Sequence, residues 1–158
     1  MIQRTQSLYL ILSMISLSIL LSGMKLIAFT GTKYHATLSA FGIEKIEIAK
    51  QQSISDHSYP FYLSIIGLVL YIFILLMRYK NLNLQLKMIR RLFFIYFLIV
   101  VAFLLFSIYG SNVIGEKEFK SEIGTGFIFL ILPFPLIFLA QLGIKRDKKL
   151  LDSLNRLR

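Results

Sequence analysis

The sequence predicts an all-α membrane protein: a bundle of four transmembrane helices, with a small outward β-hairpin or sheet formed by the first loop. Three observations predict this class. Hydrophobic residues make up 56% and charged residues 16% of the 158-residue chain, whereas a soluble domain has roughly 45–50% and about 25%. The apolar residues are gathered in four blocks, each close to the length that a helix needs to cross a bilayer. The charged residues lie between the blocks and are unequally divided between the two sides.

The predicted spans are residues 7–22, 59–77, 92–110 and 123–143, and none of them contains Asp, Glu, Lys, Arg or His. Because backbone groups in hydrocarbon must pair internally, these spans are expected to be helices. The first block extends toward Phe29, and with its preceding basic residue it also fits a signal peptide. We favour a retained span, because the apolar run is long and no small-residue cleavage site follows it. One membrane domain, residues 1–158, is therefore expected.

The segments between the spans fall into two groups by charge. Residues 1–6, 78–91 and 144–158 hold 12 basic and 2 acidic residues, whereas residues 24–58 and 111–122 hold 6 of each. The net charge of +10 therefore lies entirely in the first group. By the positive-inside rule that side is cytoplasmic. We expect a multi-pass protein of the bacterial inner (cytoplasmic) membrane, with cytoplasmic N- and C-termini and two outward loops.

The first outward loop, residues 24–58, is predicted to form a small β-hairpin or sheet that rests on the bundle. Lys33–Leu38 and Ile43–Ile48 contain alternating and β-branched residues, and Phe41 and Gly42 between them are typical of a turn. The isoleucine spacing in the second of these segments is also compatible with a short helix.

The rest of the outward sequence is less regular. Gln51–Ser58 is polar and is expected to be irregular, while residues 111–122 are expected to form another strand or simply a turn. A long first outward loop and a short second one resemble the topology of the claudin and tetraspan membrane proteins. Those families mark their loop with Trp and paired Cys, and this chain has neither. The analogy therefore concerns topology and implies no function.

Pro133 and Pro135 lie within the predicted fourth span. Each removes a backbone donor, so a kink or an unwound turn is expected there. Broken helices line substrate sites in transporters, but the nearest polar residue is Gln141. We therefore favour packing or a notch for a partner. The spans also lack ionisable groups, which argues against a pump, a proton-coupled transporter and an intramembrane protease.

The first loop holds His35 and His57, the only histidines, together with Asp56. Their spacing matches no compact metal-ligand pattern, and neither an orienting group nor a Gly-rich phosphate loop accompanies them. The chain has no cysteine, which excludes disulfides and thiolate catalysis. We expect a non-enzymatic protein with no cofactor and no metal.

The cytoplasmic segments carry the residues expected to contact a partner or lipid. Leucines recur at helical spacing in residues 150–157, so the tail is predicted to extend the fourth span or to turn along the membrane. Topology and the anchoring of anionic lipid headgroups explain the charge, and docking of other integral membrane proteins is the sharper hypothesis; nucleic acid binding is not needed. The residues are Arg4, Arg78, Arg90, Arg91, Lys145, Arg146, Lys148, Lys149, Arg156 and Arg158.

The chain begins MIQRTQSLYL, residues 1–10, and ends KKLLDSLNRLR, residues 148–158. Both ends resemble those of a family of short membrane proteins found in Bacteroidota, although this tail is more basic. Four spans in a chain of this length are also similar to that family. The resemblance implies the inner membrane as the compartment and a domain of unknown function. It implies no activity and no functional residue.

Three functions fit these observations. We favour a non-catalytic accessory or scaffold subunit of a larger inner-membrane complex, of the secretion or envelope-assembly type. The chain is small, its spans carry no charged site, and its two basic segments are suited to docking. The first alternative is a small oligomeric transporter or channel that uses the kinked fourth span. The second is a membrane enzyme or lipid-binding protein that uses the first loop, with His35, His57 and Asp56 as candidate residues.

Overall fold

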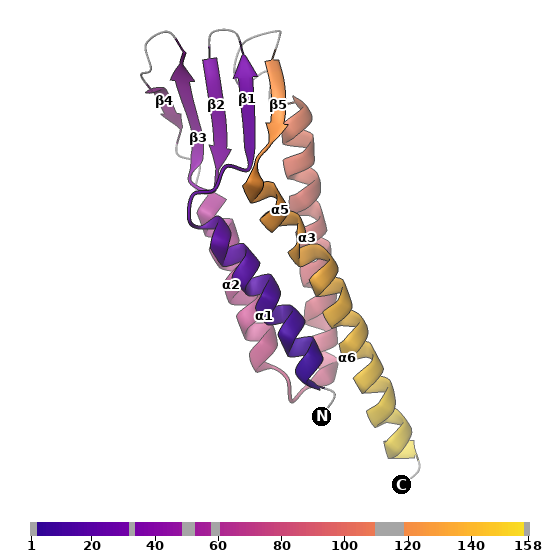
Figure 1. The fold of residues 1–158 in the computed structure, drawn as a ribbon. Coiled ribbons are helices and arrows are strands. Elements are labelled where there is room, and N and C mark those ends of the chain that lie inside the picture. Colours follow the sequence, from indigo (N-terminus) through magenta and orange to yellow (C-terminus); the bar gives the residue numbers. More distant parts are fainter. Residues whose placement is uncertain (1–2, 32–33, 49–52, 58–60, 110–118, 157–158) are drawn as a thin grey trace.

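The computed structural model describes residues 3–31, 34–48, 53–57, 61–109 and 119–156 (Figure 1). The helices lie side by side in a bundle, and the strands form a sheet at one end of it (Figure 1). The start of α1 and the end of α6 lie at the opposite end. The elements in chain order are α1 Gln3–Leu20, β1 Ile27–Gly31, β2 Tyr34–Ser39, β3 Gly42–Glu47, β4 Ser53–His57, α2 Phe61–Met77, α3 Leu82–Tyr109, β5 Phe119–Ile123, α5 Thr125–Ile131 and α6 Pro133–Arg156.

Each long helix buries one face against its neighbours. In α2 the buried residues are Ile65, Leu68, Ile72 and Leu75, which are three and four positions apart and therefore share one helical face. α1 packs against α6 and α2, and α6 also packs against α3. The interior of the bundle is thus a single apolar core that the helices enclose together.

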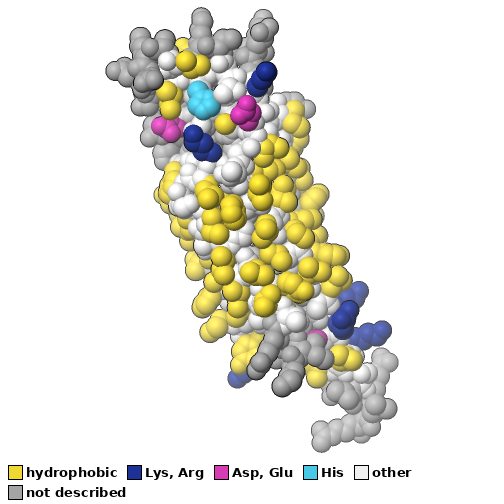
Figure 2. Space-filling model, viewed as in Figure 1, with side chains coloured by type: hydrophobic (Ala, Val, Ile, Leu, Met, Phe, Trp, Pro, Cys, Tyr) yellow, Lys and Arg dark blue, Asp and Glu magenta, His cyan; other side chains and the backbone are white. Residues whose placement is uncertain are grey.

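The outer faces of the helices are apolar as well. Figure 2 shows hydrophobic side chains over the middle of the visible surface, with charged side chains gathered at its two ends. In the described part of the chain, the helical stretches Leu82–Ile108 and Thr125–Ser153 are long and apolar enough to cross a membrane. Thr5–Leu20 and Phe61–Met77 are shorter apolar helices. The expected mostly helical architecture is confirmed, and two of the four predicted spans correspond to helices long and apolar enough to cross a membrane.

The sheet has five antiparallel strands in the order β4-β3-β2-β1-β5. The predicted strands at residues 33–38 and 43–48 are confirmed as β2 and β3, so the second segment is a strand and not a helix. Ser39 pairs with Gly42 across a two-residue turn. Gly42 has a φ of +144°, a conformation that side chains disfavour, which explains the glycine at this position.

One expectation about the first loop was wrong, and one open possibility at the end of the first span is decided. Ser53–His57, predicted to be irregular, is strand β4, because β3 offers it a row of backbone hydrogen-bond partners along the edge of the sheet. The first span does not extend toward Phe29: α1 ends at Leu20, Gly23 follows with a φ of +82°, and Phe29 belongs to strand β1. A residue with positive φ ends a helix.

The second outward segment contributes a strand, β5, which is one of the two alternatives that the sequence left open. β5 pairs with β1, so it joins residues that are far apart in the chain. Residues 111–118 of this segment lie outside the described part of the chain. The element predicted to face outward is therefore a five-stranded sheet built from both loops, larger than a hairpin from the first loop alone.

Helix boundaries also differ from the predicted spans. α3 begins at Leu82, well before residue 92, so most of the predicted basic segment 78–91 is the first part of this helix. α6 continues to Arg156, which makes the tail an extension of the fourth span. The helix is interrupted between α5 and α6 at Leu132, directly before Pro133.

Candidate functional site

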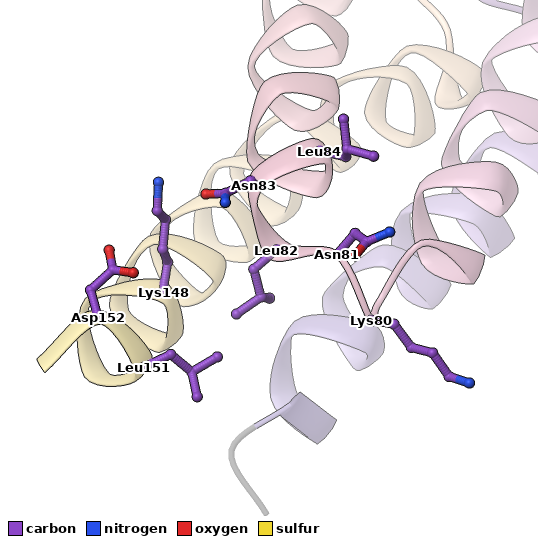
Figure 3. A pocket seen from close by; sticks show the side chains of 8 residues that line it. All are labelled: Lys80, Asn81, Leu82, Asn83, Leu84, Lys148, Leu151 and Asp152. Carbon is purple, nitrogen blue, oxygen red and sulfur yellow. The ribbon is translucent and has the colours of Figure 1, made fainter. Parts of the chain in front are cut away.

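Two adjoining pockets lie between α3 and α6 at the end of the bundle that holds the termini. The first, of about 370 Å³, is shown in Figure 3 and is lined by Lys80, Asn81, Leu82, Asn83, Leu84, Lys148, Leu151 and Asp152. The second, also about 370 Å³, is lined by Asn83, Leu86, Lys87, Arg90 and Lys148. Asn83 and Lys148 line both, so the two pockets form one groove along the pair of helices. We call this the α3–α6 groove.

The helical repeat of α3 explains why its polar residues meet there. Leu82, Leu86 and Ile89 are buried against the bundle. Asn83, Lys87 and Arg90 are four and three positions apart, so they share the adjacent face. α6 supplies Lys148 from the opposite side of the groove, as Figure 3 shows for the first pocket.

The groove is basic, and most strongly so in its second pocket. Among the described residues, those that line this pocket include three cations, Lys87, Arg90 and Lys148, and no carboxylate. In the first pocket Asp152 lies one helical turn from Lys148 and offsets part of the charge. Guanidinium and ammonium groups are the usual protein ligands of phosphate and carboxylate. The second pocket is thus suited to an anionic group.

The sequence-predicted contact residues divide into three sets. Arg90 and Lys148 line the groove, and Lys148 is half-buried there. Arg4 and Arg156 belong to α1 and α6, but their side chains, like the whole of Arg158, lie outside the described part. The others are exposed, and none of them lines either pocket: Arg78, Arg91, Lys145, Arg146 and Lys149.

Sequence reasoning missed Asn83 and Lys87, which complete the second pocket. A signal was present, because both share a helical face with Arg90. It was obscured by the assumption that residues 78–91 form a separate segment, when most of them belong to α3.

A buried polar pair, Gln6 of α1 and Asp147 of α6, lies at the same end of the bundle. Both side chains are buried, Asp147 with 7% of its surface exposed. The Gln6 amide donates a hydrogen bond to Asp147 Oδ2, while Asp147 Oδ1 is buried without a hydrogen-bond partner. Gly143 leaves room for the glutamine, because a Cβ at this position would lie 2.7 Å from Gln6 Cγ.

The sequence also held a signal for Asp147. It follows the buried residues Ile137, Ala140 and Ile144 at spacings of three, four and three, which places all four on one helical face. From the sequence, Asp147 was counted only among the acidic residues of the basic tail. Its burial depends on α1, which lies against this face of α6.

The helix break at Pro133 is held by two neighbouring helices. A proline at 133 cannot donate to the Phe129 carbonyl one turn earlier. Ser16 of α1 donates to that oxygen instead, with an O–O distance of 2.8 Å. Tyr96 of α3 donates to the adjacent carbonyl of Leu130. Freed backbone acceptors are satisfied in this way when proline interrupts a membrane helix.

The structure does not bring the loop histidines together. His35 on β2 pairs with Ile46 on β3, whereas His57 on β4 pairs with Ile43. The two histidines are thus separated by the intervening strand β3 as well as along the strands. In the described residues no group of three or more His, Cys, Asp or Glu side chains is placed to hold a metal ion.

The fold and the groove define a class: a mostly helical protein whose apolar helices end in a small antiparallel sheet on one side and in a basic groove on the other. Residues 2–157 match a family described as "Domain of unknown function (DUF4293)". The chain belongs to this family, which confirms the expectation of a family of unknown function. No curated protein matches it.

Proposed function

We propose that this protein is a four-span inner-membrane protein that serves as a non-catalytic accessory or scaffold subunit of a larger membrane complex. One observation carries the proposal: helix α3 is apolar but is hardly covered by its own chain. Only 11% of its most apolar window is buried, against 33% for the window in α5 and α6. A helix with this much uncovered apolar surface needs lipid or another membrane protein around it.

The shorter helices fit the same bilayer. α1 has 18 residues and α2 has 17, so they are about 27 and 25 Å long at 1.5 Å per residue. A hydrocarbon core of about 30 Å is crossed by roughly 17–25 residues. α1 packs against both α2 and α6, and α6 packs against α3. The four proposed spans therefore fit side by side in one bilayer.

The orientation follows from the two ends of the bundle. The basic ends of α3 and α6 lie where the termini lie, and the sheet lies at the other end (Figures 1 and 2). The positive-inside rule assigns the basic end to the cytoplasm. The resemblance of both chain ends to a Bacteroidota membrane-protein family supports the same compartment, and a secretion or envelope-assembly machine is the kind of complex we propose.

The scaffold role is supported by the character of the uncovered α3 surface. Phe94, Phe97 and Leu98 are exposed on this helix. Aromatic side chains supply large contact areas at protein interfaces. We therefore assign α3 to the contact with a partner helix and the sheet to the outward side of the complex.

The test is purification of the tagged full-length chain from native membranes in mild detergent, with partners identified and quantified by mass spectrometry. We expect a stoichiometric membrane partner. Phe94→Ala combined with Leu98→Ala is expected to release it. The matched control is Leu63→Ala combined with Leu70→Ala on the exposed face of α2, which is expected to retain it. A lone monomer or homo-oligomer from the wild type would overturn the scaffold role.

A further inference from the structure

We propose that the second pocket of the α3–α6 groove is a binding site for the phosphate-bearing headgroup of an anionic phospholipid. The site comprises Asn83, Leu86, Lys87, Arg90 and Lys148. The inference rests on the proposed function, because it requires this end of the bundle to meet the inner leaflet. It goes further because it assigns lipid binding to one defined site, whereas a general surface charge would attract any anion.

The charge of the pocket selects the ligand class. Two ammonium groups, one guanidinium and one amide line the same space, and no acidic residue is among the described residues that line it. A phosphodiester offers a negative charge and several acceptor oxygens to such donors. Arg90 is suited to two parallel hydrogen bonds, and the lysines act as point charges.

The pocket differs from the other basic surface of this end in that two helices build it. Lys87 and Arg90 project from one face of α3, and Lys148 comes from α6 across the groove. Lys148 is half-buried and Lys87 and Arg90 are exposed. Arg91, Lys145 and Lys149 are also exposed, but they line neither pocket. Convergence of charges from two elements concentrates the local field on one ligand position.

Apolar surface directly beside the pocket favours a lipid over free phosphate. Phe138 and Leu142 are exposed on α6. The two helices touch at this level, because the ring centroids of Phe93 and Phe138 are 5.9 Å apart. A headgroup held by the cations would thus have its acyl chains against exposed aromatic and aliphatic side chains, and inorganic phosphate would gain nothing from them.

The experiment measures lipid retained by the full-length chain. The protein is purified in mild detergent, phosphatidylglycerol or phosphatidylethanolamine is titrated in, and native mass spectrometry counts the bound lipids. The pocket variant carries Lys87→Gln, Arg90→Gln and Lys148→Gln. The control variant carries Arg91→Gln, Lys145→Gln and Lys149→Gln, which removes the same charge from the same two helices. Equal thermal stability and membrane insertion of both variants establish that they fold.

We expect the wild type to retain one phosphatidylglycerol in preference to phosphatidylethanolamine. The pocket variant is expected to bind it about tenfold or more weakly, because it loses three charges that surround the headgroup, and electrostatic attraction falls off with distance. The control is expected to change binding by less than about threefold, because its three charges lie outside the pocket. A tenfold excess of inorganic phosphate over lipid should not displace it.

Four results would overturn the site. Equal weakening in both variants would show that surface charge in general attracts lipid. Displacement by inorganic phosphate would show a free-anion site. An inserted, stable protein that retains no phosphatidylglycerol would refute the lipid site and leave the four-span proposal intact. Release of the wild type from membranes by alkaline extraction would refute the four-span proposal itself, and the lipid site with it.

Discussion

The two ends of the bundle are held together by different forces. At the sheet end, order comes from the backbone: five strands pair in an antiparallel ladder, and α5 begins against a neighbouring main chain, with Gly124 and Gly126 donating to the carbonyls of Leu26 and Lys25 at 2.9 Å. At the end with the termini, order comes from side chains, through helix packing and the buried pair of Gln6 and Asp147.

The two ends of the bundle also differ in charge. In the sequence, the segments around the sheet hold equal numbers of acids and bases, whereas the segments at the other end are strongly basic. Backbone pairing leaves a sheet tolerant of varied side chains, while an end built from helices depends on which side chains meet. The comparison teaches that added bulk should cost more stability at the sheet end, where it meets a fixed main chain, than at the basic end, where a side chain can move aside.

The largest expected effect concerns the placement of the two ends on opposite sides of the membrane. The chain has no cysteine, so Ser121→Cys in β5 and Ser153→Cys in α6, both at exposed positions, give a matched pair of probes. A membrane-impermeant maleimide applied to intact spheroplasts is expected to label only the first, because we propose that the basic end is cytoplasmic. Permeabilised membranes should allow both to react. Labelling of both in intact spheroplasts would contradict the proposed placement of the two ends on opposite sides.

The second prediction tests the rigidity of the sheet end. A Cβ at Gly124 would lie 2.2 Å from the backbone oxygen of Lys25, and neither main chain can move without disturbing the β1–β5 pairing. Gly124→Ala is expected to lower the unfolding free energy by about 3 kcal/mol, measured by thermal unfolding in detergent. Gly67→Ala, with nothing within 4 Å, is the control and should change stability by less than about 0.5 kcal/mol. Equal stability of the two variants would refute the rigid junction.

The third prediction makes the same substitution at the basic end. A Cβ at Gly143 would meet the flexible side chain of Gln6 at 2.7 Å, not a main chain. Gly143→Ala is therefore expected to cost about 1–2 kcal/mol, less than Gly124→Ala. Because Gln6→Ala removes the clash, the double variant should be more stable than the sum of the single changes predicts. Strict additivity in thermal unfolding would show that Gly143 and Gln6 do not interact.

The smallest expected effect lies midway between the two ends, at the break before Pro133. Ser16→Ala removes the donor to the Phe129 carbonyl and is expected to cost about 1 kcal/mol in thermal unfolding. The matched control is Ser18→Ala, because Ser18 is exposed and donates only to Met14 in its own helix. In a Pro133→Ala background the backbone N–H can bond Phe129 instead, so the cost of Ser16→Ala should disappear. An unchanged cost in that background would contradict the compensation.

Local sequence patterns predicted the helices and strands correctly where the pattern was strong. The apolar blocks predicted each long helix, and β-branched alternation around the Phe41–Gly42 turn predicted β2 and β3. Strands β4 and β5 were predicted wrongly or left open, because polar edge strands owe their form to the neighbour that pairs with them. Likewise, hydrophobicity alone placed the start of the third span at residue 92, since α3 begins with a polar turn that packing makes helical.

By itself, the sequence determined the apolar helices, the uneven charge and the position of the helix break, because each depends on residues close together in the chain. Only the tertiary structure decided that Lys148 and Arg90 line one pocket, that Gln6 bonds Asp147, and that Ser16 bonds the carbonyl freed by Pro133. These contacts join helices that are distant in the chain, and the local spacing of residues carries no information about which helix lies opposite. The α3–α6 groove is for that reason a property of the fold, although every one of its charges is visible in the sequence.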